Sequence, residues 1–148
     1  MNNSTLLPLS LIALGGVAVA MQAPLNAALS RTMGSPLGAA TVSFGLGFLA
    51  LALLTLASSG LEPASRLGAV PLWQFAGGLL GAYYVWSVLS GVAALGVVTA
   101  MAGMILGQLT AGLLIDHFGA FGVTVHAISP RRLLAVGLVA AGLVLSRL

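Results

Sequence analysis

The stretch LGAATVSFGLGFLALALLTLA, from Leu37 to Ala57, contains no charged residue and decides the class of this fold. An α-helix needs about 20 apolar residues to cross the roughly 30 Å hydrocarbon core of a bilayer. Gly34-Ser35-Pro36 before the stretch is a turn that also primes a helix, because proline is favoured in a first turn, and Ser58-Ser59-Gly60 ends it. We therefore predict a membrane-spanning helix over residues 37–57.

Four more apolar stretches accompany this one, and the few charged residues fall between them. Only 5% of the chain is charged and 59% is hydrophobic, so the chain lacks the polar residues that would coat a water-facing surface. This excludes a soluble protein. The sequence predicts an all-α integral membrane protein, with residues 1–148 forming a single five-helix transmembrane domain. Its spans are expected at about 6–29, 37–57, 72–92, 95–115 and 131–148.

Local signals shape these spans. Pro24 removes a backbone hydrogen bond and is expected to bend the first span. Trp73 stands where the third span begins, as expected for an interfacial aromatic residue. A tight reversal at Ser90-Gly91-Val92-Ala93 is expected to join the third and fourth spans as a hairpin. Although Ala18-Val19-Ala20 resembles a signal-peptide cleavage site, residues 1–5 carry no Lys or Arg, which favours a retained span.

The arginines predict how the chain inserts. With five spans, three arginines lie on the same side of the membrane as the N-terminus: Arg66, Arg131 and Arg132. Two lie on the opposite side, Arg31 and Arg147. Because Lys and Arg asymmetry in short loops sets orientation, this small bias predicts insertion in both directions. We expect an antiparallel homodimer of ten helices with its substrate site near the two-fold axis. A heterodimer with a paralogous, oppositely oriented partner is the alternative.

Rows of small residues four positions apart let helices approach closely where lipid gives no hydrophobic drive for association. Ordinary packing within the chain is one use of such rows, and a subunit interface is another. The rows are Ala39, Ser43 and Gly47; Gly77 and Gly81; and Thr99, Gly103, Gly107 and Ala111.

Polar and aromatic side chains inside the spans are the candidates for substrate binding. Gln22 and Asn26 share one helical face, and amides in hydrocarbon are costly unless they have partners. They bind a substrate, or they pair with a neighbouring helix or with carbonyls freed by Pro24; Gln108 has the same two interpretations. Three aromatic residues of the third span either line a cavity for an organic solute or pack in the core: Tyr83, Tyr84 and Trp86.

Asp116 is the acid closest to a span, and His117 follows it. The pair could form a proton relay, or a mobile gate with the glycines that follow. The alternative is that both residues cap the end of the fourth span among the lipid headgroups. Arg131 and Arg132 either anchor the fifth span there or attract an anionic substrate.

Several classes of activity are not supported. The scattered arginines form no nucleic-acid patch, and the absence of cysteine removes disulfides and thiol chemistry. No Ser, His and acid arrangement suggests hydrolysis, two histidines without further ligands make a weak metal site, and no phosphate loop follows a strand. We expect a protein that is not an enzyme and needs no cofactor or metal.

Motifs along the whole chain resemble the YdcZ-like family, a domain-of-unknown-function group of the drug/metabolite transporter superfamily. They are Gln22-x-x-x-Asn26, Gly34-Ser35-Pro36-Leu37-Gly38-Ala39-Ala40, Trp73 followed by Gly77-Gly78-Leu79-Leu80-Gly81-Ala82, Gly107-Gln108-Leu109 and Asp116-His117-Phe118-Gly119. The resemblance implies five-helix subunits in the bacterial inner membrane that form antiparallel dimers or occur as paired or fused genes. It implies no particular substrate.

One departure from related small multidrug exporters is informative. Those proteins carry a glutamate in the first helix that binds both proton and cationic drug, whereas Gln22 and Asn26 cannot titrate. The sequence favours secondary transport of a small solute by alternating access, without that proton-coupled mechanism. The alternatives are a passive channel formed by an antiparallel dimer and a non-transporting accessory membrane subunit.

Overall fold

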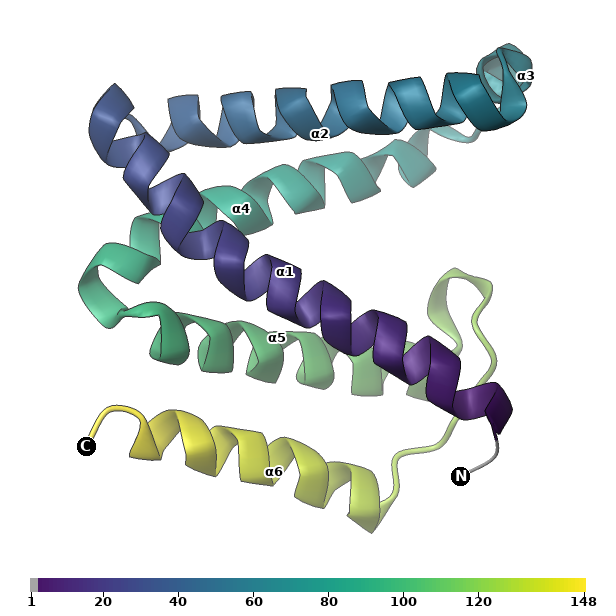
Figure 1. The fold of residues 1–148 in the computed structure, drawn as a ribbon. Helices are drawn as coiled ribbons and strands as arrows, with labels where there is room; N and C mark the ends of the chain where they lie inside the picture. The colour runs from purple at the N-terminus through teal and green to yellow at the C-terminus, as the bar shows by residue number, and fades with distance from the viewer. Residues whose placement is uncertain (1–2) are drawn as a thin grey trace. The chain divides into compact units, whose positions relative to one another are not determined.

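The computed structural model describes the backbone from Asn3 to Leu148 and the side chains from Leu6, and these residues are mainly helical (Figure 1). The five long helices are α1 (Asn3–Met33), α2 (Pro36–Ser59), α4 (Ala76–Leu95), α5 (Val97–Phe118) and α6 (Pro130–Leu145). The short elements are α3 (Glu62–Ser65) and the 3₁₀ turns Leu67–Ala69, Leu72–Phe75 and Ala120–Gly122. The predicted all-α class is confirmed.

Four helical segments of the described chain are long and apolar enough to cross a membrane. They are Leu6–Met33, Pro36–Ser59, Leu72–Leu95 and Val97–Phe118. They match the first four predicted spans, with ends that differ by about one helical turn. Helix α6 has 16 residues, which makes it about 24 Å long, shorter than the roughly 30 Å hydrocarbon core. The fifth crossing therefore stays a prediction.

The starts of α2 and α6 use the same local chemistry. The Ser35 hydroxyl accepts a hydrogen bond from the Gly38 amide at 3.0 Å, and the Ser129 hydroxyl accepts one from the Arg132 amide at 3.4 Å. A proline follows each serine at the first helical position, where its missing N–H costs nothing. The predicted turn before the second span is confirmed.

The break between the third and fourth spans lies later than predicted. Helix α4 continues through Ser90–Ala93 to Leu95, so the reversal expected at Ser90–Ala93 is wrong. The Ser90 hydroxyl donates to the Trp86 carbonyl of its own helix at 2.9 Å instead of ending it. The chain breaks at Gly96, where φ is 77° and ψ is 165°. Only glycine adopts this conformation readily.

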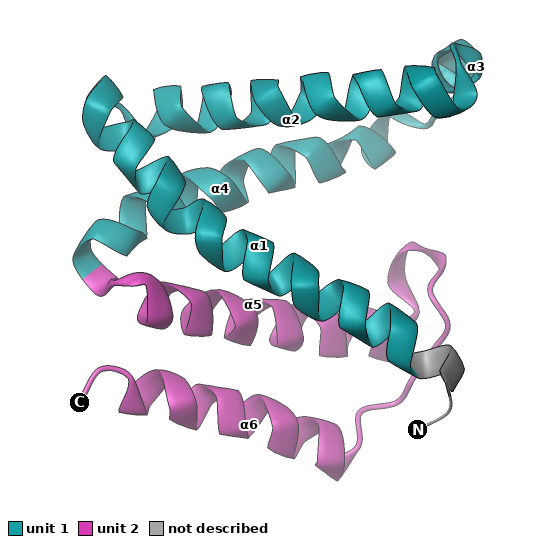
Figure 2. Ribbon diagram, in the orientation of Figure 1, with its two compact units in different colours: residues 1–94 teal, residues 95–148 magenta. Residues whose placement is uncertain are grey.

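The helices fall into two compact units, residues 1–94 and residues 95–148 (Figure 2). In the first unit, α2 packs against α4 through a small core of Ala39, Ala40, Val85 and Leu89, with Leu29 of α1 beside it. Ala39 is completely buried. Where α2 passes α4, a Cβ atom built on Gly81 would meet the Phe44 ring at 3.7 Å, an ordinary van der Waals distance, so the buried alanines mark the closest packing. Small residues thus set these helix contacts, as expected in lipid.

The second unit is an antiparallel pair of helices with polar contacts at both ends. Near the start of α5, the Thr99 hydroxyl lies 3.2 Å from the Ser146 hydroxyl, just after the end of α6. At the other end, Asp116 of α5 forms an ion pair with Arg132 of α6. Helix α6 therefore follows α5 along most of its length.

Gly96→Ala should destabilise the protein, because an alanine at the observed backbone angles is strained by about 1–3 kcal/mol. Unfolding of the purified protein by heat or by SDS measures this loss. Gly103→Ala is the matched control, since that glycine lies inside α5 with no atom within 4 Å of the new methyl group. If both variants are equally stable, the backbone at Gly96 does not require glycine.

Candidate functional site

A small pocket lies within the first unit, between α1 and α4. Its volume is about 10 Å³, close to the space that one water molecule needs. Three polar residues line it, Gln22, Asn26 and Tyr84, together with the apolar residues Val19, Ala23, Val85, Val88 and Leu89. The structure thus brings together three of the six residues predicted to bind substrate. Their binding role stays a prediction.

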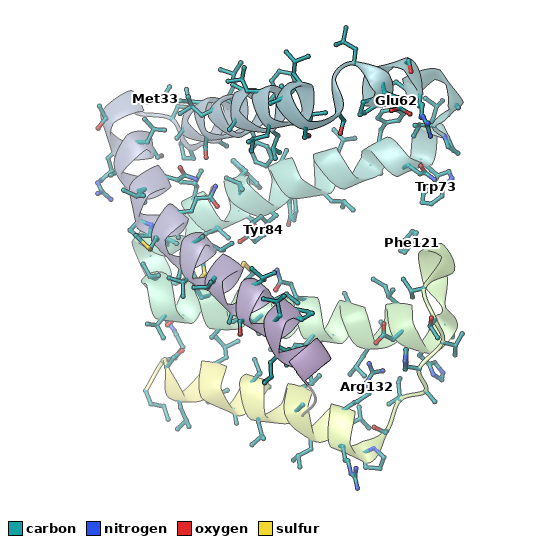
Figure 3. All side chains as sticks on the ribbon, turned by 45° about the vertical axis from the view of Figure 1, so that its right-hand side comes forward. Met33, Glu62, Trp73, Tyr84, Phe121 and Arg132 are labelled. Carbon is teal, nitrogen blue, oxygen red and sulfur yellow. The ribbon has the colours of Figure 1, made fainter. Side chains whose placement is uncertain are left out.

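The spacing of α1 explains how the amides reach this pocket. Gln22 and Asn26 are four residues apart, so both lie on the face of α1 that also buries Ala23 and Ala27. These alanines are small enough to let α1 approach its neighbours closely. Figure 3 shows Tyr84 on α4. Tyr84 is the third polar residue that lines the pocket.

The Asn26 amide is the unusual group of the pocket. Its residue is only 8% exposed, yet it forms no hydrogen bond with another described residue. No fully enclosed polar side-chain atom of the described chain lacks a partner, so the Asn26 amide keeps some accessible surface, and its residue lines the pocket. The hydroxyl of Tyr84 likewise makes no hydrogen bond to the described residues. The pocket therefore offers unused hydrogen-bonding groups.

Gln22 has a partner that the sequence did not identify. Its side-chain nitrogen donates to the Ser43 hydroxyl of α2 across a long 3.4 Å. Ser43 was interpreted only as a small packing residue, although a hydroxyl inside a span could have indicated this role. Both residues also line a wider groove of about 350 Å³, together with Phe44, Gly47, Phe48 and Leu51. Gln22 therefore borders both the pocket and the groove.

The other predicted binding residues lie outside this pocket. Tyr83 is 65% exposed and Trp86 is 43% exposed, and their ring centroids lie 6.0 Å apart. Gln108 belongs to α5 in the second unit and is exposed. Any binding by these three residues stays a prediction.

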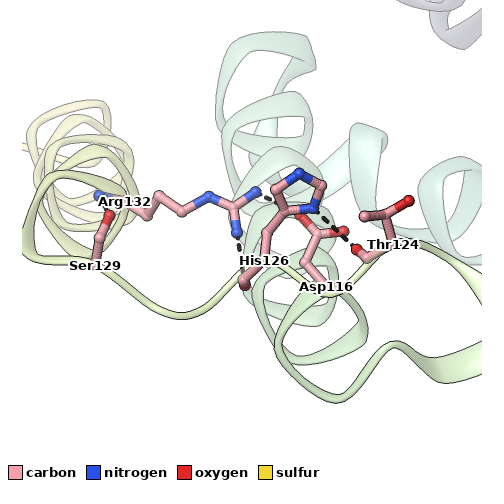
Figure 4. Close-up of polar contacts among 5 residues, drawn as sticks. All are labelled: Asp116, Thr124, His126, Ser129 and Arg132. Carbon is pink, nitrogen blue, oxygen red and sulfur yellow. Dashed lines mark hydrogen bonds and ion pairs between the residues drawn. The ribbon is translucent and has the colours of Figure 1, made fainter.

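The loop between α5 and α6 holds a cluster of polar contacts (Figure 4). Besides its ion pair with Asp116, the Arg132 guanidinium donates to the His126 carbonyl at 3.2 Å. The His126 amide donates to the Asp116 carbonyl at 2.8 Å, and a ring nitrogen of His126 lies 2.9 Å from the Thr124 carbonyl. These contacts tie the loop to both helices of the second unit.

His117 does not take part in this cluster. Its ring lies edge-on to Phe118, with centroids 4.9 Å apart, and the residue is exposed. Gly119 ends α5 in the left-handed region, and a Cβ built there would lie 2.7 Å from a Val125 methyl group. The proton relay and the gate stay predictions. Among the described residues, no group of three or more His, Asp or Glu side chains could hold a metal ion.

Comparison with known proteins assigns the family. The family model described as "Putative inner membrane exporter, YdcZ" matches residues 7–145. The chain belongs to this family. It is 27% identical over 129 residues to "Inner membrane protein YdcZ" of Escherichia coli (strain K12), which covers 86% of this chain and 85% of that protein. No solved structure shows significant similarity.

The predicted resemblance to the YdcZ family of the drug/metabolite transporter superfamily is therefore confirmed. With several long apolar helices, this family member is a multi-pass protein of the inner membrane. Its family is one of membrane transporters.

Asn26→Leu should leave the stability of this YdcZ-family protein unchanged or raise it by about 1 kcal/mol, because an unpartnered amide is replaced by an apolar group. Unfolding by heat or SDS measures the change. Thr99→Val is the contrasting variant, since buried Thr99 has a hydroxyl partner and should lose stability. If Asn26→Leu is destabilised as much as Thr99→Val, the amide has a structural partner and the site assignment fails.

Proposed function

We propose that this YdcZ-family protein is a secondary transporter that exports a small solute across the bacterial inner membrane by alternating access. The observation that carries the proposal is the Asn26 amide, which is nearly buried inside a span without a hydrogen bond to a described residue. Polar groups in membrane spans are costly and usually serve a function. The membership in a family described as an inner membrane exporter supports the same conclusion.

Alternating access would explain why the pocket is small. Its volume of about 10 Å³ is far below the roughly 300–1,000 Å³ of ordinary ligand pockets. An organic solute could enter only after the helices move or a second chain adds to the site. The candidate spans bury only 6–11% of their residues within one chain, which leaves most of each helix free to contact lipid or a second copy.

The proposal includes five membrane crossings, with α6 as the fifth. Helix α6 is antiparallel to α5 and is fastened to it near both ends by Thr99–Ser146 and Asp116–Arg132. If α5 crosses the membrane, α6 crosses it in the opposite direction, because α6 is antiparallel to α5 and is held against it near both ends. A short span can be accommodated by local thinning of the bilayer and by long flanking side chains such as Arg131.

Five crossings place the two termini on opposite sides of the membrane. The three-to-two division of arginines then gives little preference for either orientation. We therefore propose an antiparallel homodimer of ten helices as the working unit. Its partners are the bilayer, the inverted copy and a small solute, and its cycle includes no catalytic step and no cofactor.

Transport is tested with purified protein in vesicles loaded with a bacterial metabolite extract, by mass spectrometry of the solutes that leave. Efflux of at least one solute should saturate with its concentration. It should fall about tenfold in Asn26→Leu, as expected for losing a binding hydrogen bond. Thr110→Val is the control, because its hydroxyl bonds only to a carbonyl of its own helix. Efflux that does not saturate and carries large currents would indicate a channel, and no efflux would refute transport.

Orientation is tested with reporters at the C-terminus that are active on only one side of the membrane. The natural sequence should give signal on both sides. Arg147→Gln should leave three arginines against one and so favour the orientation with the N-terminus in the cytoplasm. A single orientation of the natural chain would contradict the homodimer and favour a paralogous partner.

A further inference from the structure

The lining of the α1–α4 pocket restricts the solute that it can hold. Of its eight residues, only Gln22, Asn26 and Tyr84 are polar, and none of the eight carries a charge at neutral pH. An ion in this pocket would lose its water without gaining a counter-charge, which is strongly unfavourable inside a membrane. The part of the solute that enters the pocket must therefore be neutral.

The polar groups also define the hydrogen bonds that this part must make. A carboxamide has two donors and an acceptor oxygen, and a phenol both donates and accepts. Asn26 and Tyr84 line the same pocket, and their amide and hydroxyl, which have no partner among the described residues, together offer both kinds of capacity. A hydroxyl or a primary amide matches them, because each of these groups donates and accepts at once. The volume of about 10 Å³ is close to that of one water molecule, so a hydroxyl matches the pocket as it stands and an amide requires the helices to move apart.

The neighbouring groove has a different character. It shares Gln22 with the pocket, and the rest of its lining is apolar apart from the Ser43 hydroxyl, with the rings of Phe44 and Phe48. Its volume of about 350 Å³ falls in the range of small-molecule sites. Gln22 is the residue that the pocket and the groove share, so a solute that reaches from Asn26 into the groove would have to displace the Gln22 side chain from Ser43.

We infer that the solute is uncharged and amphipathic, with a hydroxyl or amide group held by Asn26 and Tyr84 and an apolar part in the groove beside Gln22. This inference rests on the proposed function, since it names the solute class of the same site. It excludes organic cations and carboxylates as the preferred solutes.

The test uses small probes that share one branched alkyl group and differ in charge. Isovaleramide and isoamyl alcohol are neutral, isovalerate is an anion, and isoamylammonium is a cation. Binding to the purified protein in nanodiscs is measured as protection from thermal unfolding, with empty nanodiscs as the control for partitioning into lipid. The neutral probes should protect the protein, and the two charged probes should not at equal concentration.

Variants connect this binding to the pocket. Asn26→Leu and Tyr84→Phe should each weaken binding of isovaleramide about tenfold, as expected for the loss of one hydrogen bond. Ser90→Ala is the control, because Ser90 lies on the same helix as Tyr84 but outside the pocket. Failure of both neutral probes to bind, equal binding of a charged probe, or binding unaffected by Asn26→Leu would each overturn the inference.

The flux experiment separates this inference from the proposed function. Saturable efflux of a charged solute that is insensitive to Asn26→Leu would leave transport standing and refute the solute class. Binding of the neutral probes without efflux of any solute would support the pocket chemistry and refute transport.

Discussion

Hydrocarbon offers no hydrogen-bond partner, and this constraint organises the whole chain. The backbone satisfies it by forming helices. Most hydroxyls in the spans satisfy it locally by donating to a carbonyl of their own helix, as Thr41 does to Leu37 and Thr110 does to Leu106. Asn26 stands apart because its amide is nearly buried and meets no such group among the described residues. The Tyr84 hydroxyl of the same pocket also meets no such group among the described residues, and the proposed function attributes both open groups to ligand binding.

The same solvent removes the hydrophobic drive that holds soluble helices together, so contacts depend on close approach. In the first unit this approach comes from small buried residues such as Ala23 and Ala39. In the second unit it is reinforced by polar contacts at the two ends of the α5–α6 pair. Close packing of small residues therefore holds the helices of the first unit together, and polar contacts reinforce the second unit. The chain passes from one to the other between residues 94 and 95, next to Gly96, whose backbone angles few other residues tolerate.

Hydropathy and proline position predicted most of the helices, because both signals are local. The break after α4 was misplaced because Gly91 and Gly96 look alike in sequence, and only the fold reveals that Gly96 needs a positive φ. Polarity inside an apolar stretch identified Gln22, Asn26 and Tyr84, but it could not separate Tyr84 from its exposed neighbour Tyr83. It also could not reveal that Asp116 pairs with Arg132, since that partner is brought near by the fold and not by the sequence.

The composition of the pocket bears on how transport is driven. Small multidrug exporters bind proton and drug at one membrane-embedded glutamate, and this pocket contains no acid. The chain has two acidic residues, Glu62 and Asp116, and both are ion-paired with arginines outside the pocket. No group that titrates near neutral pH lines the pocket, so a proton that drives transport would have to bind elsewhere in the chain. Export of a neutral solute that accumulates inside the cell needs no such coupling, because the membrane potential does no work on it and its own concentration gradient drives it outward. In the proposed function, the amides that stand where an acid would be in α1 account both for a neutral solute and for a cycle without a coupling ion.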